Sequence, residues 1–167
     1  MVYVWTASRT LTLYGEMRLA YEVSGLVAGD VCIVGGCIGG DALIAELAWQ
    51  IDGVHIHCVL PADHSRVDPH WREHCHSFEQ MPDGTDYRAR DQRMVDIGLL
   101  KHGVLKVCPS WPESHPAAKR SGTWLTKRLA VRAGLPFELV PLWEEDGEGR
   151  NRAVSQRGAR PVPYGVE

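Results

Sequence analysis

Residues 31–50 read VCIVGGCIGGDALIAELAWQ and decide how this chain is expected to fold. The apolar run 31–34 is typical of a strand covered on both faces of a parallel sheet. A six-residue turn follows and holds four glycines: Gly35, Gly36, Gly39 and Gly40. Glycine frees the backbone so that main-chain N–H groups can converge, and the helix that begins at Asp41 adds a partial positive charge. The stretch predicts a phosphate or carboxylate site, with a tight turn that holds no ligand as the alternative.

Length and composition are those of an ordinary globular domain. The 167 residues suffice for one conventional core, and 44% hydrophobic and 23% charged residues are usual values. A net charge of -3 lacks the basic excess typical of nucleic-acid-binding proteins, so nucleic acid is not an expected partner. No stretch approaches the roughly 20 apolar residues that cross a bilayer, and the start, MVYVWT, is unlike a secretion signal. We expect a cytoplasmic protein without membrane contact, its five cysteines reduced.

Strand and helix patterns alternate along residues 1–142. Apolar runs predict five strands, at 2–6, 31–34, 54–60, 104–108 and 137–142. Apolar stripes at helical spacing predict four main helices, at 15–27, 42–51, 86–100 and 121–133. Residues 63–86 are polar, with room for a short helix near 70–77. The order predicts one Rossmann-like α/β domain, with a mostly parallel five-stranded sheet and helices on both faces. Residues 143–167 carry clustered charges and are expected to form a flexible tail.

Four short motifs fall at the carboxyl edge of this predicted sheet, where ligands of such folds bind. They are Thr6-Ala7-Ser8-Arg9, the turn from Val34 to Leu43, Arg90-Asp91-Gln92-Arg93-Met94-Val95-Asp96, and Ser121-Gly122-Thr123. With these motifs, residues 2–142 resemble the SLOG superfamily of Rossmann-like ligand-binding proteins, in particular its YspA/YpsA branch. The resemblance implies a nucleotide or nucleotide-derived ligand, and a second copy of the chain as partner in a homodimer.

The resemblance also implies how such a ligand is held. Its phosphate would lie on the main chain of the glycine turn and on the helix that starts near Ser121, with Ser8 and Arg9 at the mouth. Guanidinium groups grip phosphate oxygens in pairs, and donors at a helix start suit the same anion. The candidate ligand-binding residues are Ser8, Arg9, Gly35, Gly36, Cys37, Gly39, Gly40, Asp41, Asp63, Arg90, Arg93, Arg120, Ser121, Gly122 and Thr123.

Four positions depart from the family pattern. Cys37 and Gly40 stand where the family's glycine turn has alanines. Asp91 stands where the family has an asparagine, and Thr126 stands where the related phosphoribohydrolases have their catalytic glutamate. The missing glutamate favours a module that senses or sequesters the nucleotide without turnover. The alternative is a hydrolase or transferase that cleaves the N-glycosidic bond of a nucleoside monophosphate or an ADP-ribose-like molecule.

An N-glycosidase needs a carboxylate near the anomeric carbon, as a nucleophile or as a base for water. Asp91, Glu113 and Glu46 are the candidate catalytic residues. Asp41 and Asp63 also fall near the edge, but Asp41 is expected to cap the helix, and Asp63 could cap or pair with a neighbouring basic residue.

The eight histidines raise a metal site as a third possibility, since His55-x-His57 and His74-Cys75-His76 contain ligands that zinc prefers. Their spacing fits no known zinc module, so neither a metal nor another cofactor is expected. Trp111 and Trp124 flank the predicted ligand edge, where an aromatic face could stack on a base.

Overall fold

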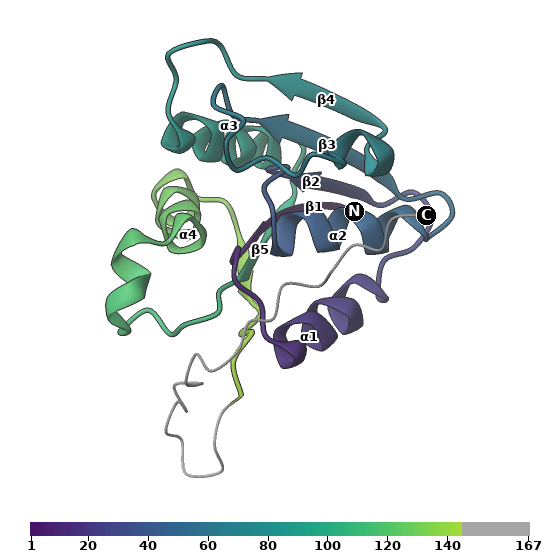
Figure 1. Cartoon of the computed structure of the whole chain (residues 1–167). Coiled ribbons are helices and arrows are strands. Elements are labelled where there is room, and N and C mark those ends of the chain that lie inside the picture. The colour runs from purple at the N-terminus through teal and green to yellow at the C-terminus, as the bar shows by residue number, and fades with distance from the viewer. Residues whose placement is uncertain (145–167) are drawn as a thin grey trace, which may run out of the picture.

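The structure is a computed structural model that describes residues 1–144. Its centre is a six-stranded sheet, parallel throughout, in the order β4-β3-β2-β1-β5-β6 (Figure 1). The strands are β1 (Val2–Ala7), β2 (Val31–Val34), β3 (His55–Leu60), β4 (Ser77–Gln80), β5 (Val104–Cys108) and β6 (Phe137–Leu139). The expected α/β class and parallel sheet are confirmed, but the sheet has six strands rather than five.

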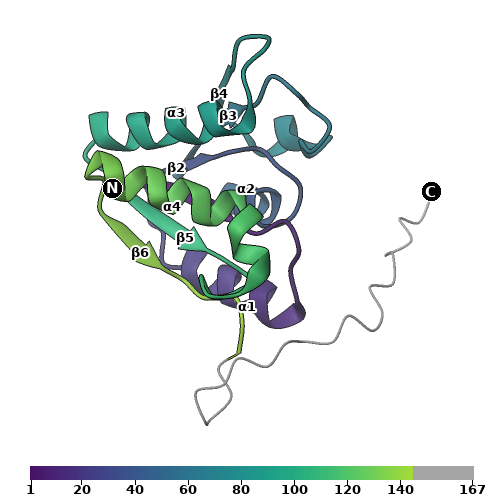
Figure 2. The same cartoon turned by 90° about the vertical axis from the view of Figure 1, so that its left-hand side faces the viewer.

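Four helices cover the two faces of the sheet (Figures 1 and 2). They are α1 (Leu13–Val23), α2 (Gly40–Trp49), α3 (Tyr87–Leu100) and α4 (Gly122–Ala133), with short 3-10 helices η1 (Trp71–His74) and η2 (Pro116–Arg120). The first two helices pack on one face and the last two on the other. Side chains of one strand alternate between the faces, so Trp5 joins the cluster under α1 and α2, whereas Val4 joins the cluster under α3 and α4.

The strand missed by the sequence patterns is β4, inside the polar stretch 63–86. Its sequence, Ser-Phe-Glu-Gln, is short, and even Phe78 is half exposed, because β4 is an edge strand with little to bury. The strand predicted over 137–142 is confined to β6, and the helix predicted over 15–27 begins earlier and ends at Val23. The burial pattern of its own sequence does not predict such a strand, because β4 is held in the sheet by its pairing with β3.

Within residues 1–144, no helix is both long enough and apolar enough to span a lipid bilayer. Most of the tail predicted over 143–167 lies outside the described residues.

Candidate functional site

The candidate site lies where the chain reverses its path through the sheet. Strands β1 to β4 step outward in one direction, and the chain then returns to place β5 on the other side of β1. The loops that follow the neighbouring strands β1 and β5 therefore lead away from each other. Ligands of folds of this type bind between two such loops. The loops are joined at their start, since Ser8 N–H donates to the Cys108 carbonyl (3.0 Å) and Ser110 N–H donates to Ser8 Oγ (2.8 Å).

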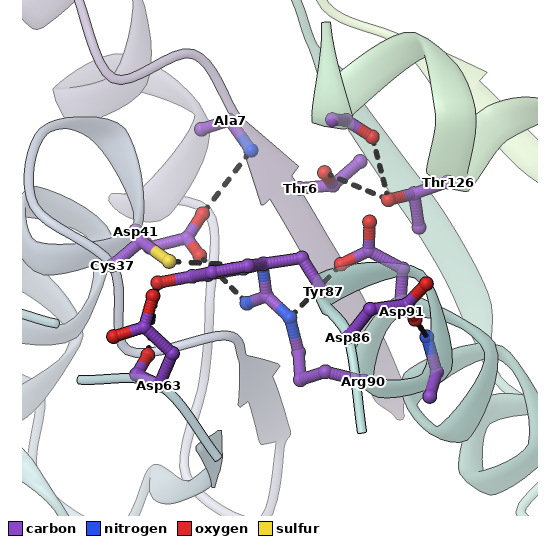
Figure 3. Close-up of polar contacts among 12 residues, drawn as sticks. Thr6, Ala7, Cys37, Asp41, Asp63, Asp86, Tyr87, Arg90, Asp91 and Thr126 are labelled. Carbon is purple, nitrogen blue, oxygen red and sulfur yellow. Dashed lines mark hydrogen bonds and ion pairs between the residues drawn. The ribbon is translucent and has the colours of Figure 1, made fainter. Parts of the chain in front are cut away.

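The glycine turn uses its N–H groups within the protein. The carboxylate of Asp41 accepts a hydrogen bond from the main-chain N–H of Ala7 (3.2 Å, Figure 3). The main-chain N–H groups of Gly35 and Cys37 also lower the pKa of this carboxyl, against the effect of burial. The N–H of Gly40 donates to the Ser8 carbonyl (3.0 Å). The turn thus receives an anion, as its sequence predicts, but that anion is a side chain of the protein. The Asp41 carboxylate thus lies where a ligand phosphate is predicted, and Asp41 is not the helix cap, because Gly39 holds the cap position of α2.

Two of the glycines are required by close neighbours rather than by a guest. A Cβ atom on Gly35 would lie 1.4 Å from Nη1 of Arg90. Gly39 has φ +88°, and a Cβ there would lie 2.2 to 2.6 Å from the main chain of Arg9. Glycine at these two positions therefore allows one arginine side chain and one loop to pack directly against the backbone of the turn.

Arg90 is the centre of a buried charge cluster. Only 7% of this residue is exposed, although it lies one turn into α3. Its Nη1 lies 3.7 Å from Asp41 Oδ2, and Nη2 donates to Cys37 Sγ (3.6 Å). Its Nε lies 2.9 Å from Asp91 Oδ1, in an ion pair without a directed hydrogen bond. The ring of Tyr87 covers the guanidinium, with its centroid 5.7 Å from Cζ (Figure 3).

Two buried carboxylates share this one guanidinium. Burial raises the pKa of Asp41, and burial raises the pKa of Asp91 to about 6, because a charged carboxylate loses its water. Burial opposes the charge of Arg90 too, but Asp91, Cys37 and Asp41 more than offset it, so the pKa of Arg90 lies above its ordinary value. The cluster therefore holds a permanent cation beside an acid that titrates close to neutral pH.

The raised pKa of Asp91 predicts a pH-dependent contribution to stability. Its folded pKa of about 6 exceeds the unfolded value, so its contribution is fully present below about pH 4 and is lost as the pH rises through 6. Asp91→Asn cannot titrate. We expect its stability relative to wild type to increase by about 2–3 kcal/mol between pH 4 and pH 7, measured by urea unfolding. A difference that does not change with pH would contradict the assignment.

The start of α4 lies beside Asp91. Ser121 caps this helix, its Oγ accepting from Trp124 N–H (3.5 Å), and Thr126 Oγ1 donates to the Gly122 carbonyl (2.9 Å). Thr126 is fully buried, accepts from Thr6 Oγ1 (3.4 Å) and lies beside Asp91, whose pKa it lowers against the effect of burial. The hydroxyl of Thr126 thus lies beside the carboxyl group of Asp91.

The structure separates several predicted residues from this cluster. Arg93 pairs with Glu79 on β4 through two hydrogen bonds (2.6 and 2.9 Å). Glu113 pairs with Lys127 (2.7 Å), and Glu46 is exposed on α2. Of the three candidate catalytic carboxylates, only Asp91 adjoins Arg90.

Other predicted residues line the rim of the edge. Arg9 and Arg120 are exposed, and Gly122 is exposed at the first position of α4, whereas Thr123 is buried. Asp63 is exposed, and its carboxylate holds the main chain of Ser65 (2.9 Å). The carbonyl of Asp63 also accepts from the Tyr87 hydroxyl (2.9 Å), so Asp63 lies next to the ring that covers the Arg90 guanidinium.

Sequence reasoning missed Tyr87 and Arg66. The guanidinium of Arg66 lies 5.4 Å from the centroid of the Tyr87 ring, so this ring contacts two arginines. Helix α3 begins at Tyr87, capped by Asp86 Oδ1, which accepts from Ala89 N–H (2.8 Å). The spacing of Tyr87 and Arg90, three residues apart at a helix start, was the available signal, because such residues share one helix face.

The two predicted tryptophans have different positions. Trp124 is buried, and its Nε1–H donates to the Trp111 carbonyl (3.0 Å), so it does not offer a face to a base. Trp111 is partly exposed and stacks on His115, with the ring centroids 4.7 Å apart. For the histidines of β3, His55 Nε2 and His57 Nδ1 both contact Ser77 Oγ (2.8 and 2.9 Å).

Comparison with known proteins supports the fold. No protein-family model matches the sequence, and a comparison with curated proteins also finds no match. Among solved structures, a molybdenum cofactor binding protein from Rippkaea orientalis is similar, with a TM-score of 0.57 and 20% identity over 83% of this chain and 74% of that chain. DNA processing protein A from Helicobacter pylori, which binds single-stranded DNA, is similar with a TM-score of 0.56 and 15% identity. This match covers 83% of our chain but 64% of that protein's chain.

These likenesses show a Rossmann-like α/β fold and correct one expectation. The exclusion of nucleic acid as a partner from a net charge of -3 is wrong, because a protein of similar fold is described as binding single-stranded DNA. Net charge sums the whole chain and does not describe the potential at one edge of a sheet.

Proposed function

We propose that this protein binds a phosphorylated nucleotide derivative at the carboxyl edge of its sheet and acts as a sensor or sequestering module of the YspA/YpsA branch. The observation that carries the proposal is the buried Arg90 cluster between the starts of α2, α3 and α4. A single guanidinium shared by two buried carboxylates costs stability, and such clusters are typical of functional sites.

The start of α4 is the better place for the ligand's phosphate, since the glycine turn is filled. The first N–H groups of a helix have no acceptor within the helix, and they carry a partial positive charge. Gly122 is exposed there, and the exposed Arg120 precedes it. Neither Arg120 nor Arg9 forms an ion pair with another residue of the range 1–144. The partly exposed Trp111 offers an aromatic face for the base near this helix start.

Gly122→Asp tests this assignment without removing a core residue. The new carboxylate would stand at the first position of α4, where an acid favours the helix but repels a phosphate. We expect wild type to show a rise in melting temperature with one member of a panel of nucleoside monophosphates, diphosphates and ADP-ribose, and the variant to lose at least about 90% of that affinity.

Gly25→Asp is the matched control, because it adds the same charge to an exposed position after α1, at the opposite edge of the sheet. It should bind as wild type does. Equal binding by wild type and Gly122→Asp would contradict the assignment, and no shift with any nucleotide would contradict the proposed function.

Hydrolysis of the N-glycosidic bond is the second candidate function, and the pKa of Asp91 near 6 favours it. A carboxylate that titrates close to neutral pH suits a general base that activates water. In the same incubations, chromatography would detect a released base. Turnover that persists in Asp91→Asn would show that Asp91 is not the general base. Tight binding without product would contradict hydrolysis and favour the sensor function.

A further inference from the structure

Helix α1 carries apolar side chains on its outer side as well as on the side that packs in the core. Leu13, Met17 and Tyr21 are 74%, 64% and 70% exposed. They are four residues apart, so they form one line along the helix, which we call the outer stripe. The stripe lies opposite the buried residues of the helix, which are Gly15, Leu19 and Val23. In a soluble protein this side of a helix is usually polar or charged.

The outer stripe lies on the surface of the molecule. Figures 1 and 2 show α1 at the outside of the fold, with its far side turned away from the sheet. Tyr14, next to the stripe, is 37% exposed as well. Exposed apolar side chains that are scattered singly need no explanation, but a continuous row of them is typical of a surface that contacts another protein.

Charged side chains of opposite sign flank the stripe. Glu16 and Arg18 are the neighbours of Met17 in sequence, so they lie about 100° to either side of it around the helix. Glu16 is exposed, and within residues 1–144 it forms no ion pair. Arg18 pairs with Glu22 (2.9 Å) and lies over the Tyr21 ring (5.5 Å). Because a guanidinium has five N–H donors, Arg18 keeps donors for a second carboxylate.

We propose that α1 is the interface through which two copies of this chain form a dimer, with the two helices parallel and a two-fold axis running along them. Each residue of the outer stripe then meets its own counterpart, so that Met17 packs on Met17 of the partner subunit. The axis turns the acidic flank of each helix toward the basic flank of the other, and Glu16 faces Arg18 of the partner subunit. This inference does not depend on the proposed function.

The flanking charges favour the parallel arrangement over the antiparallel one. In an antiparallel pair the two-fold axis would be perpendicular to the helices, and Glu16 would lie on the same side as Glu16 of the partner subunit. Packed helices are about 8–10 Å apart, a distance that glutamate and arginine side chains can bridge together. The parallel pair therefore brings opposite charges together on both sides of the stripe, whereas the antiparallel pair brings like charges together.

The contact is small, which sets the expected strength of the dimer. α1 has 11 residues and is therefore about 16 Å long. A specific interface buries at least roughly 1,000 Å² on the two partners together, and one pair of short helices lies close to that lower limit. We expect a reversible dimer with a dissociation constant of about 1–100 μM.

Sedimentation of the full chain over a range of concentrations tests the proposal. We expect wild type to pass from monomer to dimer between about 1 and 500 μM. Met17→Glu and Met17→Lys should each weaken dimerisation at least about tenfold, because each places two like charges at the two-fold axis. Wild type that stays a monomer at the highest concentration would overturn the proposal, and this includes the case in which residues 145–167 cover the stripe.

Mixing the two Met17 variants tests the symmetry of the pair. An equimolar mixture of Met17→Glu and Met17→Lys should dimerise again, because the new carboxylate then meets the new ammonium group. Mixing would not restore a dimer that was lost through damage to the fold or through loss of apolar surface alone. A mixture that stays monomeric, while wild type dimerises, would contradict the contact of Met17 with its own counterpart.

Glu16→Gln distinguishes the two helix directions. In the parallel pair it removes an attraction and should weaken dimerisation about two- to fivefold, with a smaller effect at high salt. In an antiparallel pair it would remove a repulsion and strengthen dimerisation, and that result would overturn the parallel arrangement.

Val131→Glu is the matched control. Val131 is 55% exposed on α4, on the other face of the sheet, so the variant adds the same charge to an exposed apolar position of another helix. It should dimerise as wild type does. A control that loses the dimer, or a Met17→Glu variant that keeps it, would show that α1 is not the interface.

Discussion

Arg90→Met should lower the free energy of unfolding by about 3–5 kcal/mol at pH 7, as measured by urea unfolding. The substitution keeps a long side chain in the site but removes the only cation within reach of Asp41 and Asp91 among residues 1–144. Both acids would then be buried without a partner, and a buried charge that loses its partner costs far more than an exposed one.

Arg93→Met is the matched control, because it is the same change one turn further along α3. Its ion pair with Glu79 is partly exposed, so we expect a loss of at most about 1 kcal/mol. Adding Asp91→Asn to Arg90→Met should restore part of the lost stability, since one of the two stranded acids is then neutral. Similar losses for the two arginine variants, or no recovery in the double variant, would refute the shared-cation description.

Gly39→Ala should cost at least about 4 kcal/mol or prevent folding. Two effects add at this position. The backbone conformation, φ +88° and ψ -129°, is strained for any residue with a Cβ, and the methyl group would meet the main chain of Arg9 at 2.2 Å. Main chain cannot rotate away as a side chain can, so the loop after β1 would have to move.

Gly84→Ala isolates the first effect. Gly84 has φ +82°, but nothing lies within 4 Å of its hypothetical Cβ, so strain alone should cost about 1–2 kcal/mol. Thermal unfolding followed by circular dichroism would compare the two variants. Equal losses would mean that the contact with Arg9 contributes nothing.

The sheet and its helices were predictable because their signals are local and periodic. Buried strands such as β5, predicted over 104–108 and observed as Val104–Cys108, are continuous apolar runs between helices with clear stripes. Strand β4 carries no such signal, because an edge strand is defined by its neighbour rather than by its own burial. Its partner β3 lies some twenty residues earlier, a relation that a single sequence does not encode.

The glycine turn shows where prediction of the site failed. The sequence predicts a turn whose N–H groups attract an anion, yet it cannot say whether a ligand or a side chain supplies that anion. Asp41 lies within the same turn and helix, and Arg90 comes from fifty residues later to neutralise it. The burial of Arg90 could not be predicted from the sequence, since an arginine on a helix is usually exposed.

The central place of β1 has a consequence for biosynthesis. β1 pairs with β2 through Val2 and Val31, but its other edge stays open until Val104 to Cys108 have been synthesised. During translation the first half-sheet would therefore expose the hydrogen-bonding groups of an apolar strand, a surface that invites association with other nascent chains. A ribosome that stalls before residue 104 would release an aggregation-prone fragment rather than a smaller stable domain.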